Sequence, residues 1–211
     1  MQKPVLYGFD GSTYVHTVRM LLAEKDAAYD QVPVDVLAGE PRQPEHLTRH
    51  PFGKVPVLDH DGMRLLETSA ITRYLDAVLP GPSYIPSNAR DRARMDMTIG
   101  LIDSYGYGCL IGAVSAYHLF PDLVGGVSDE AREDGIACSK VVLGEIMKIR
   151  DASTFIAGDG PSLADFFLAP ICFYVTLTTD ADAVFDVPNI KDWWQRVQAL
   201  PSYKSTEPDL G

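Results

Sequence analysis

A proline-rich segment divides this sequence into two parts with different patterns of apolar residues. Residues 80–89 read PGPSYIPSNA, and their three prolines and one glycine are typical of a break between structural elements. Before this segment, short strand-like runs alternate with stretches of helical period, and after it the apolar spacing is helical. We therefore predict two domains, residues 1–80 and 89–211, joined by a linker over residues 81–88.

The part before the break carries the order strand, helix, strand, loop, strand, strand, helix. A strand–helix–strand opening predicts a βαβ unit with two parallel strands. Pro33 lies within the second expected strand, Tyr29–Val36, and places that strand at an edge of the sheet. An Asp-Gly turn predicts that the third and fourth strands form a hairpin. The expected elements are Pro4–Phe9, Thr13 to about Glu24, Tyr29–Val36, Val55–Asp59, Met63–Leu66 and Thr68–Val78.

The part after residue 88 has no convincing strand. Helical spacing of apolar residues covers four segments, which are Arg90–Leu119, Asp129–Arg150, Ser162–Thr178 and Asn189–Leu200. We predict an all-α domain there.

Charge and cysteine content exclude several classes of function. The net charge of −11 would repel a phosphate backbone, so nucleic acid is not an expected partner. The three cysteines are odd in number and lack a C-x-x-C pair, which argues against a disulfide framework and a zinc site. The N-terminal apolar run is too short for a signal peptide, and no run approaches the roughly 18 apolar residues of a membrane span. We expect a cytoplasmic protein that binds no metal and no membrane.

Three segments carry polar or backbone groups that suit a ligand, and each has an ordinary structural alternative. Pro56 follows Val55 in HPFGKVPVL, where it is either an edge-strand proline or part of a cis bond that turns the Val55 backbone toward an extended peptide. Glu67 and Thr68 begin a predicted helix, as an N-cap or as a carboxylate site. Ser12 precedes the first helix, as an N-cap or as a donor to an anion such as a thiolate.

Taken together, these segments resemble the cytosolic glutathione transferases of the serine type, and most closely the phi- and theta-like group. The resemblance rests on the serine between the first strand and helix, on PFGKVPVL and on LLETSAI. FIAGDGPSLADFFLAP is similar to the buried capping box and helix of that family, with Ser162 and Asp165 in the reciprocal capping spacing and Pro170 expected to kink the helix. The resemblance implies a thioredoxin-like α/β domain (βαβ then ββα) followed by an all-α helical bundle.

The resemblance also implies a role for individual residues. Ser12 matches the catalytic serine that holds the glutathione thiolate. Val55, ahead of a cis Pro56, matches the residue whose backbone pairs with the cysteinyl unit. The γ-glutamyl end would be held by Glu67 and Thr68, and the glycyl carboxylate by Arg42 and Lys54.

Other positions depart from the family pattern or are less well defined. Pro41 stands where relatives often have a histidine, and His50 replaces the asparagine of N-P-F-G, with no role assigned to it. Tyr14 and Tyr107 are the candidates for the hydrophobic pocket of the second substrate. The alternative is that these tyrosines only pack against other side chains.

The resemblance implies an enzyme of the detoxification type that transfers glutathione, its co-substrate, to a small hydrophobic electrophile. It implies a homodimer, with Phe52 a candidate to insert into the second subunit. Two alternatives remain open. One is a glutathione-dependent lyase, isomerase, dehalogenase or peroxidase on the same fold, and the other is a non-catalytic interaction module.

Overall fold

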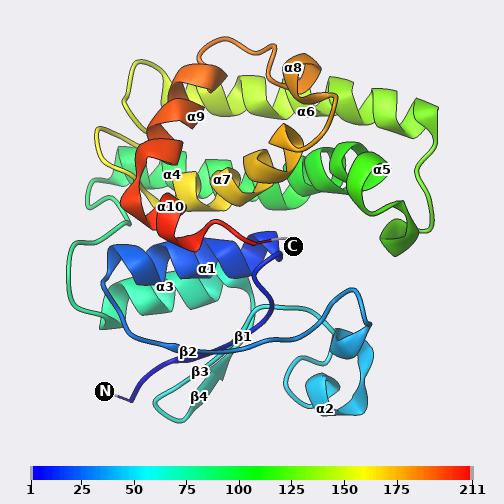
Figure 1. Cartoon of the computed structure of the whole chain (residues 1–211). Helices are drawn as coiled ribbons and strands as arrows, with labels where there is room; N and C mark the ends of the chain where they lie inside the picture. Colours follow the sequence, from blue (N-terminus) through cyan, green and yellow to red (C-terminus); the bar gives the residue numbers. More distant parts are fainter. Residues whose placement is uncertain (1, 210–211) are drawn as a thin grey trace. The chain divides into compact units, whose positions relative to one another are not determined.

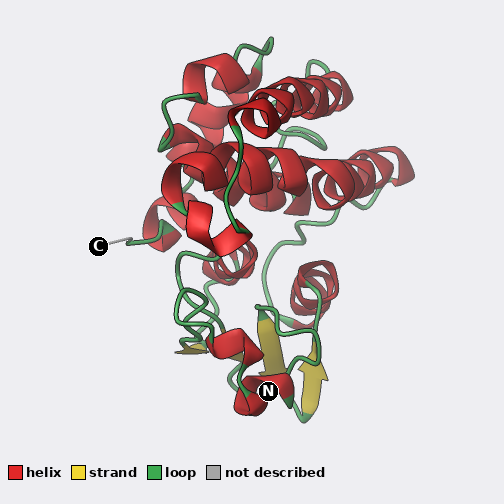
Figure 2. Cartoon of the chain, turned by 90° about the vertical axis from the view of Figure 1, so that its right-hand side faces the viewer, coloured by secondary structure: helices red, strands yellow, loops and turns green. Residues whose placement is uncertain are grey.

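The chain forms two compact units. The computed structural model describes residues 2–209. One unit comprises the chain up to Tyr84 together with the segment from Pro201 onward, and the other spans Ile85–Leu200 (Figure 1). Strands occur in the first unit, and the described second unit is helical (Figure 2). This confirms the predicted α/β and all-α parts.

The first unit is built on a four-stranded mixed sheet. The strand order is β2-β1-β3-β4, with β1 parallel to β2 and antiparallel to β3, and with β3 antiparallel to β4. The strands are β1 (Val5–Tyr7), β2 (Asp30–Val32), β3 (Val57–His60) and β4 (Met63–Leu65). The parallel pair and the hairpin are confirmed. The strand β2 ends directly before Pro33 and lies at the edge, where the missing N–H of proline costs the ladder no hydrogen bond.

Helices α1 (Thr13–Glu24) and α3 (Thr68–Val78) pack together on one face of this sheet (Figure 1). The apolar stripe predicted for the first helix is fully buried at Val15, Val18 and Leu21. Such a stripe gives a short helix its stability, because burial contributes about 1.5–3 kcal/mol for each large aliphatic side chain. Two short helical segments, η1 (Glu40–Arg42) and α2 (Pro44–Leu47), lie in the loop after β2.

The boundary of the first unit differs from the predicted range at two places. Buried Lys25 forms an ion pair with Asp76 at 3.0 Å and donates a hydrogen bond to the carbonyl of Pro82, and Asp76 accepts the backbone N–H of Tyr84. These bonds fix the start of the predicted linker to α1 and α3. The last helix, α10 (Pro201–Thr206), packs against α1, although its sequence position placed it in the helical part.

The second unit contains one long helix that runs from Ala89 to Leu119. It consists of α4 (Ala89–Leu101), the π-helical segments η2 (Ile102–Gly106) and η3 (Gly108–Ser115), and α5 (Ala116–Leu119). The remaining elements are η4 (Pro121–Val124), α6 (Asp129–Arg150), α7 (Leu163–Thr176), α8 (Ala181–Val184) and α9 (Ile190–Ala199). The long helix follows the predicted bounds, and the π-helical turns were not predicted.

By length and composition alone, the helix from Ala89 to Leu119 could cross a membrane, since its 18-residue window has a mean hydropathy of 1.2. The sequence prediction concerned uninterrupted apolar runs, whereas this helix reaches its mean hydropathy with polar residues and glycines among the apolar ones. In the structure 44% of that window is buried. Side chains such as Met95, Ile102 and Leu110 are fully buried against the other helices of the unit, which accounts for part of the apolar composition.

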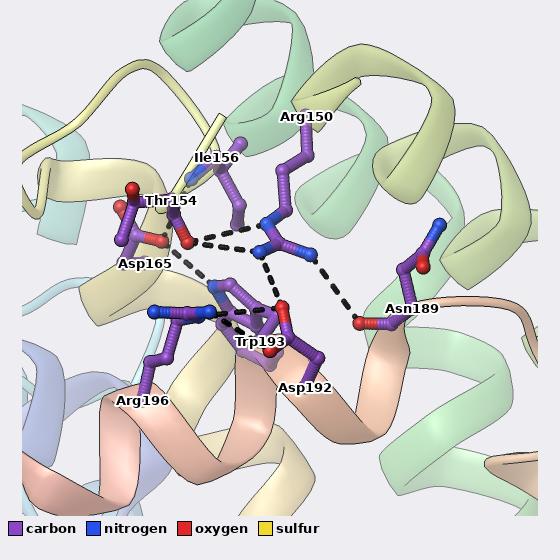
Figure 3. Close-up of polar contacts among 8 residues, drawn as sticks. All are labelled: Arg150, Thr154, Ile156, Asp165, Asn189, Asp192, Trp193 and Arg196. Atoms are coloured by element: carbon purple, nitrogen blue, oxygen red, sulfur yellow. Dashed lines mark hydrogen bonds and ion pairs between the residues drawn. The ribbon is translucent and has the colours of Figure 1, made fainter. Parts of the chain in front are cut away.

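The start of α7 is held by a buried carboxylate. Asp165 accepts the Nε1–H of Trp193 at 2.8 Å and the backbone N–H of Ile156 at 3.1 Å (Figure 3). Its other oxygen accepts the backbone N–H and the hydroxyl of Ser162, at 2.8 and 2.9 Å. This confirms the predicted capping box. Burial raises the pKa of Asp165, and the hydrogen bonds from Trp193, Ile156 and Ser162 oppose that rise.

A second polar cluster lies beside this carboxylate. The buried side chain of Arg150 donates to the carbonyls of Thr154 and Asn189 and pairs with Asp192 at 2.7 Å (Figure 3). Arg150 is the last residue of α6, where carbonyls lack helical partners and a cation is favoured. The cluster therefore joins α6 to α9.

Candidate functional site

Three of the predicted ligand segments meet at one edge of the sheet. Because β3 is antiparallel to both β1 and β4, the carboxyl ends of β1 and β4 lie at the same edge as the amino end of β3. Ser12 follows β1, the Val55–Pro56 bond precedes β3, and Glu67 follows β4. The sheet thus gathers at one edge three segments that are far apart in the sequence.

Ser12 is the N-cap of α1. Its Oγ accepts the backbone N–H of Val15 at 3.4 Å, which is a long bond. Within residues 2–209 the hydroxyl donates no hydrogen bond, and the side chain is half-buried. Its hydrogen is therefore available to an acceptor, at a helix end that favours negative charge.

The Val55–Pro56 peptide bond is cis, as the resemblance implied. Pro56 is buried, and β3 begins at the next residue, Val57, which pairs with Tyr7 of β1. Val55 precedes β3, so its backbone N–H and C=O are not committed to the sheet. An extended peptide can pair with these groups.

Glu67 has an unusual backbone conformation at the start of α3. Its φ of 69° lies in the left-handed region, which costs a residue other than glycine about 1 kcal/mol or more. The carboxylate is exposed and does not cap the helix. The next residue, Thr68, is buried in the first turn. Strained backbone of this kind is common at binding and catalytic sites, where the surrounding structure holds the residue in place.

The two predicted cations belong to segments in direct contact. A Cβ placed on Gly53 would lie 2.9 Å from the carbonyl oxygen of Pro41 and 3.6 Å from Cγ of Arg42, and Gly53 has a φ of +60°. Only glycine suits this close approach of the loop before β3 to η1. Arg42 and Lys54 are exposed, and neither forms an ion pair within residues 2–209. Two uncommitted cations on touching segments suit a carboxylate.

The loop residues also place Glu67 and Lys54 within electrostatic reach of His50. Burial lowers the pKa of His50, Glu67 opposes the change, and His46 and Lys54 lower the pKa further. From the sequence alone, His50 has no assigned role and His46 is not distinguished from other loop residues. Their signal in the sequence was two histidines in the segment directly before PFGK.

The two tyrosines picked for a hydrophobic pocket lie in different units. Tyr14 is half-buried in the first turn of α1, and Tyr107 lies between the two π-helical segments. Burial together with Tyr107 raises the pKa of Tyr174 on α7 to about 12. Tyr117 donates its hydroxyl hydrogen to Asp129 at 2.6 Å. The role of Tyr14 and Tyr107 in substrate binding stays a prediction.

No group of three or more His, Cys, Asp or Glu side chains suited to a metal was found in residues 2–209. The polar groups at the sheet edge are a hydroxyl, two cations, a carboxylate and free backbone groups, which fit a charged organic ligand.

Two family models match the chain. The N-terminal domain of glutathione S-transferase matches residues 4–77, and the C-terminal domain matches residues 139–201. Glutathione S-transferase 4 of Zea mays is 31% identical over 93% of this chain and 88% of its own length. Maleylacetoacetate isomerase of Rhizobium meliloti (strain 1021) is 33% identical over 79% of this chain and 78% of its own length.

A solved structure shows the same likeness over nearly the whole chain. Glutathione S-transferase I from mais, in complex with an atrazine glutathione conjugate, has a TM-score of 0.83 and 26% identity. The match covers 98% of this chain and 97% of that one.

Proposed function

Because this chain belongs to the glutathione S-transferase family, we propose that the sheet edge binds glutathione and that Ser12 holds its sulfur as a thiolate for attack on a hydrophobic electrophile. The supporting observation is the common edge shared by Ser12, the cis Val55–Pro56 bond and Glu67. A tripeptide that pairs with the Val55 backbone is laid along this edge.

The chemistry follows from the properties of the thiol. A free thiol has a pKa of about 8.5 and is mostly protonated at neutral pH. Lowering that pKa by about two units requires about 2.7 kcal/mol of preferential binding to the thiolate. A charge-assisted hydrogen bond from Ser12 and the N-terminus of α1 supply an energy of that order.

The charges of the site match those of glutathione. Arg42 and Lys54 attract the glycyl carboxylate, which would otherwise be repelled by a protein of net charge −11. Glu67 attracts the ammonium of the γ-glutamyl end, and Thr68 binds its carboxylate at the start of α3. Tyr14 and Tyr107 are proposed, each taken separately, as residues that contact the electrophile.

The assembly and location belong to the same proposal. Phe52 is 77% exposed at the tip of the loop before β3, which supports its insertion into a second copy of the chain. We propose a cytoplasmic homodimer.

A second reaction on the same site is favoured by one comparison. The relative from Rhizobium meliloti is named maleylacetoacetate isomerase and is 33% identical to this chain. A thiolate held by Ser12 can add to an activated double bond and leave again, which allows rotation about that bond. An isomerase of this kind uses glutathione without consuming it.

Ligand binding tests the proposed function directly. We expect glutathione at about a hundred times its Kd to stabilise the fold by about 2.7 kcal/mol, because it binds the folded state only. The measurement is a melting curve with and without glutathione, followed by turnover assays with an aryl halide and with cis-configured unsaturated diacids. A melting temperature that does not respond to millimolar glutathione would establish the non-catalytic alternative.

Arg42→Ala is expected to raise the KM for glutathione about tenfold and to leave kcat nearly unchanged. Arg42 would contact the glycyl carboxylate, which is remote from sulfur, so its loss removes binding that ground state and transition state share. Steady-state kinetics with glutathione and with γ-glutamylcysteine, which lacks the glycine, measure the effect. The variant should weaken binding of glutathione and leave γ-glutamylcysteine unaffected. An equal loss for both ligands, or a fall in kcat alone, would contradict this role.

A further inference from the structure

We propose that His46 and His50 are positioning residues of the glutathione site, and that they fix the loop from His50 to Lys54 in the shape that presents the Val55 backbone to the ligand. This inference rests on the proposed function, because it assigns the loop's geometry to glutathione binding. Neither histidine is placed in contact with glutathione.

His46 holds the end of the loop. Its ring is buried, and Nε2 lies 2.8 Å from the carbonyl oxygen of Lys54. A carbonyl only accepts, so Nε2 carries the hydrogen of this bond. The bond fixes the peptide group that joins Lys54 to Val55. Within residues 2–209 the other nitrogen, Nδ1, has no hydrogen-bond partner, so Nε2 makes the hydrogen bond of this ring.

His50 holds the start of the loop through the opposite nitrogen. Its Nδ1 accepts the backbone N–H of Phe52 at 3.3 Å, and its own carbonyl accepts the N–H of Gly53 at 2.9 Å. The ring is buried, which lowers its pKa and keeps Nδ1 free to accept near neutral pH. The ring of Phe52 packs edge-on against His50. The charged and titratable groups that act on His50 are Glu67, His46 and Lys54.

The loop between these two bonds requires such support. Gly53, the residue before Lys54, adopts a φ of +60° and approaches the carbonyl of Pro41 closely. The tip of the loop, Phe52, is exposed, so its own side chain does not anchor the loop in the core. The two histidine bonds and the contact at Gly53 therefore determine where the Lys54–Val55 peptide group lies.

The consequence for kinetics is specific. The loop carries backbone groups for the cysteinyl unit and a cation for the glycyl carboxylate, whereas the sulfur is held by Ser12 from another segment. Loosening the loop weakens binding of glutathione in the ground state and in the transition state alike. KM for glutathione should rise, and kcat at saturating glutathione should change little.

The two bonds allow a crossed test, because they use different ring nitrogens. In asparagine, Oδ1 is separated from Cβ by the same number of bonds as Nδ1 in histidine. In glutamine, Nε2 is separated from Cβ by the same number of bonds as Nε2 in histidine. His50→Asn and His46→Gln should therefore keep their bonds. His50→Gln and His46→Asn also carry a side-chain amide, but its polar atoms lie one bond too far from Cβ or one bond too near. These two variants should lose the hydrogen bonds.

The measurement is KM for glutathione and kcat with an aryl halide for the wild type and all four variants. We expect His50→Gln and His46→Asn to raise KM about threefold to tenfold, the size of one lost hydrogen bond, with kcat within about twofold. His50→Asn and His46→Gln should stay within about twofold of the wild type in both constants. The proposal is overturned if the two substitutions at either position behave alike.

His60→Gln provides a matched control. His60 is another buried histidine of the first unit with hydrogen bonds at both nitrogens, to Tyr74 and to the carbonyl of Gln2. Its replacement should lower the melting temperature and leave KM for glutathione unchanged. A rise in KM of the same size as for His46→Asn would show that any buried histidine has this effect, and would overturn the proposal.

A measurement on the wild type does not depend on the folding of variants. In the ¹⁵N spectrum of the histidine rings, both His46 and His50 should carry the hydrogen on Nε2 near neutral pH. The Nδ1–H form at either residue would overturn the proposal. Failure of wild-type protein to bind glutathione would reject the proposed function, whereas normal binding without the crossed pattern would reject this inference alone.

Discussion

Ser12→Ala is expected to lower turnover by up to about fiftyfold near pH 6.5, where half of the wild-type thiol is ionised, while it weakens glutathione binding by less than about threefold. The hydroxyl acts on the charge of the sulfur, and the rest of the tripeptide is bound by other segments. Without the donor, the bound thiol returns toward its ordinary pKa of about 8.5, so only about one molecule in a hundred is a thiolate at pH 6.5.

The pH dependence of turnover should differ between the wild type and Ser12→Ala. In the wild type, the rate should rise with an apparent pKa of about 6.5 and then level off. In Ser12→Ala the apparent pKa should move up toward 8.5, so the rate keeps rising above that pH and the two profiles approach each other at high pH. The measurement is kcat with an aryl halide from pH 5.5 to 9.5, with glutathione binding determined by calorimetry.

Ser128→Ala is the matched control, because Ser128 also caps a helix. Its Oγ accepts the N–H of Ala131 at 3.1 Å at the start of α6. Both substitutions remove an N-cap, which costs about 0.5–2 kcal/mol of stability. Only the one at residue 12 should change the pH profile. Parallel profiles for wild type and Ser12→Ala would remove the hydroxyl from the mechanism and leave it as a cap.

The elements that the sequence predicts well are those with local signals at their ends. The bounds of α3 and α6 agree with the predicted ranges, because an apolar stripe marks α3 and the capping residue Ser128 marks the start of α6. The capping box at Ser162 and Asp165 was predictable for the same reason. The hairpin of β3 and β4 followed from one Asp-Gly turn.

The elements that the sequence does not predict depend on contacts between distant residues. Nothing near Pro201 indicates that α10 packs against α1, where His16 and Thr206 lie 3.1 Å apart. The π-helical turns of the long helix keep the apolar pattern of an α-helix, so periodicity alone does not reveal them. Gly100, Gly106, Gly108 and Gly112 interrupt that helix, but glycine does not specify which irregularity forms.

The candidate site divides in the same way. Ser12, Glu67 and the segment around Pro56 were identified by resemblance, and the sheet topology explains why they belong together. His46 and His50 were passed over because a histidine in a loop has no distinctive spacing. Their importance lies in which ring nitrogen meets which backbone group, and only the structure contains that information.

Asp165→Ala is expected to have the largest effect on stability in the chain, about 4 kcal/mol. The carboxylate accepts four hydrogen bonds from Trp193, Ile156 and Ser162, and its removal leaves these donors buried without a partner. Each such group costs about 1–3 kcal/mol. Because a typical domain is stable by only about 5–15 kcal/mol, much of the second unit's stability would be lost.

Two further variants and one probe make this prediction specific. Asp165→Asn keeps the shape but turns an amide N–H₂ toward one pair of donors, so it should cost about half as much. Asp192→Asn changes a half-exposed carboxylate that pairs with Arg150 and Arg196, and should cost less than about 1 kcal/mol. Urea unfolding followed by tryptophan fluorescence measures all three, because both tryptophans of the chain lie in α9 and Trp193 binds Asp165. Equal losses for Asp165→Asn and Asp192→Asn would show that negative charge, and not the four-donor arrangement, stabilises this end of α7.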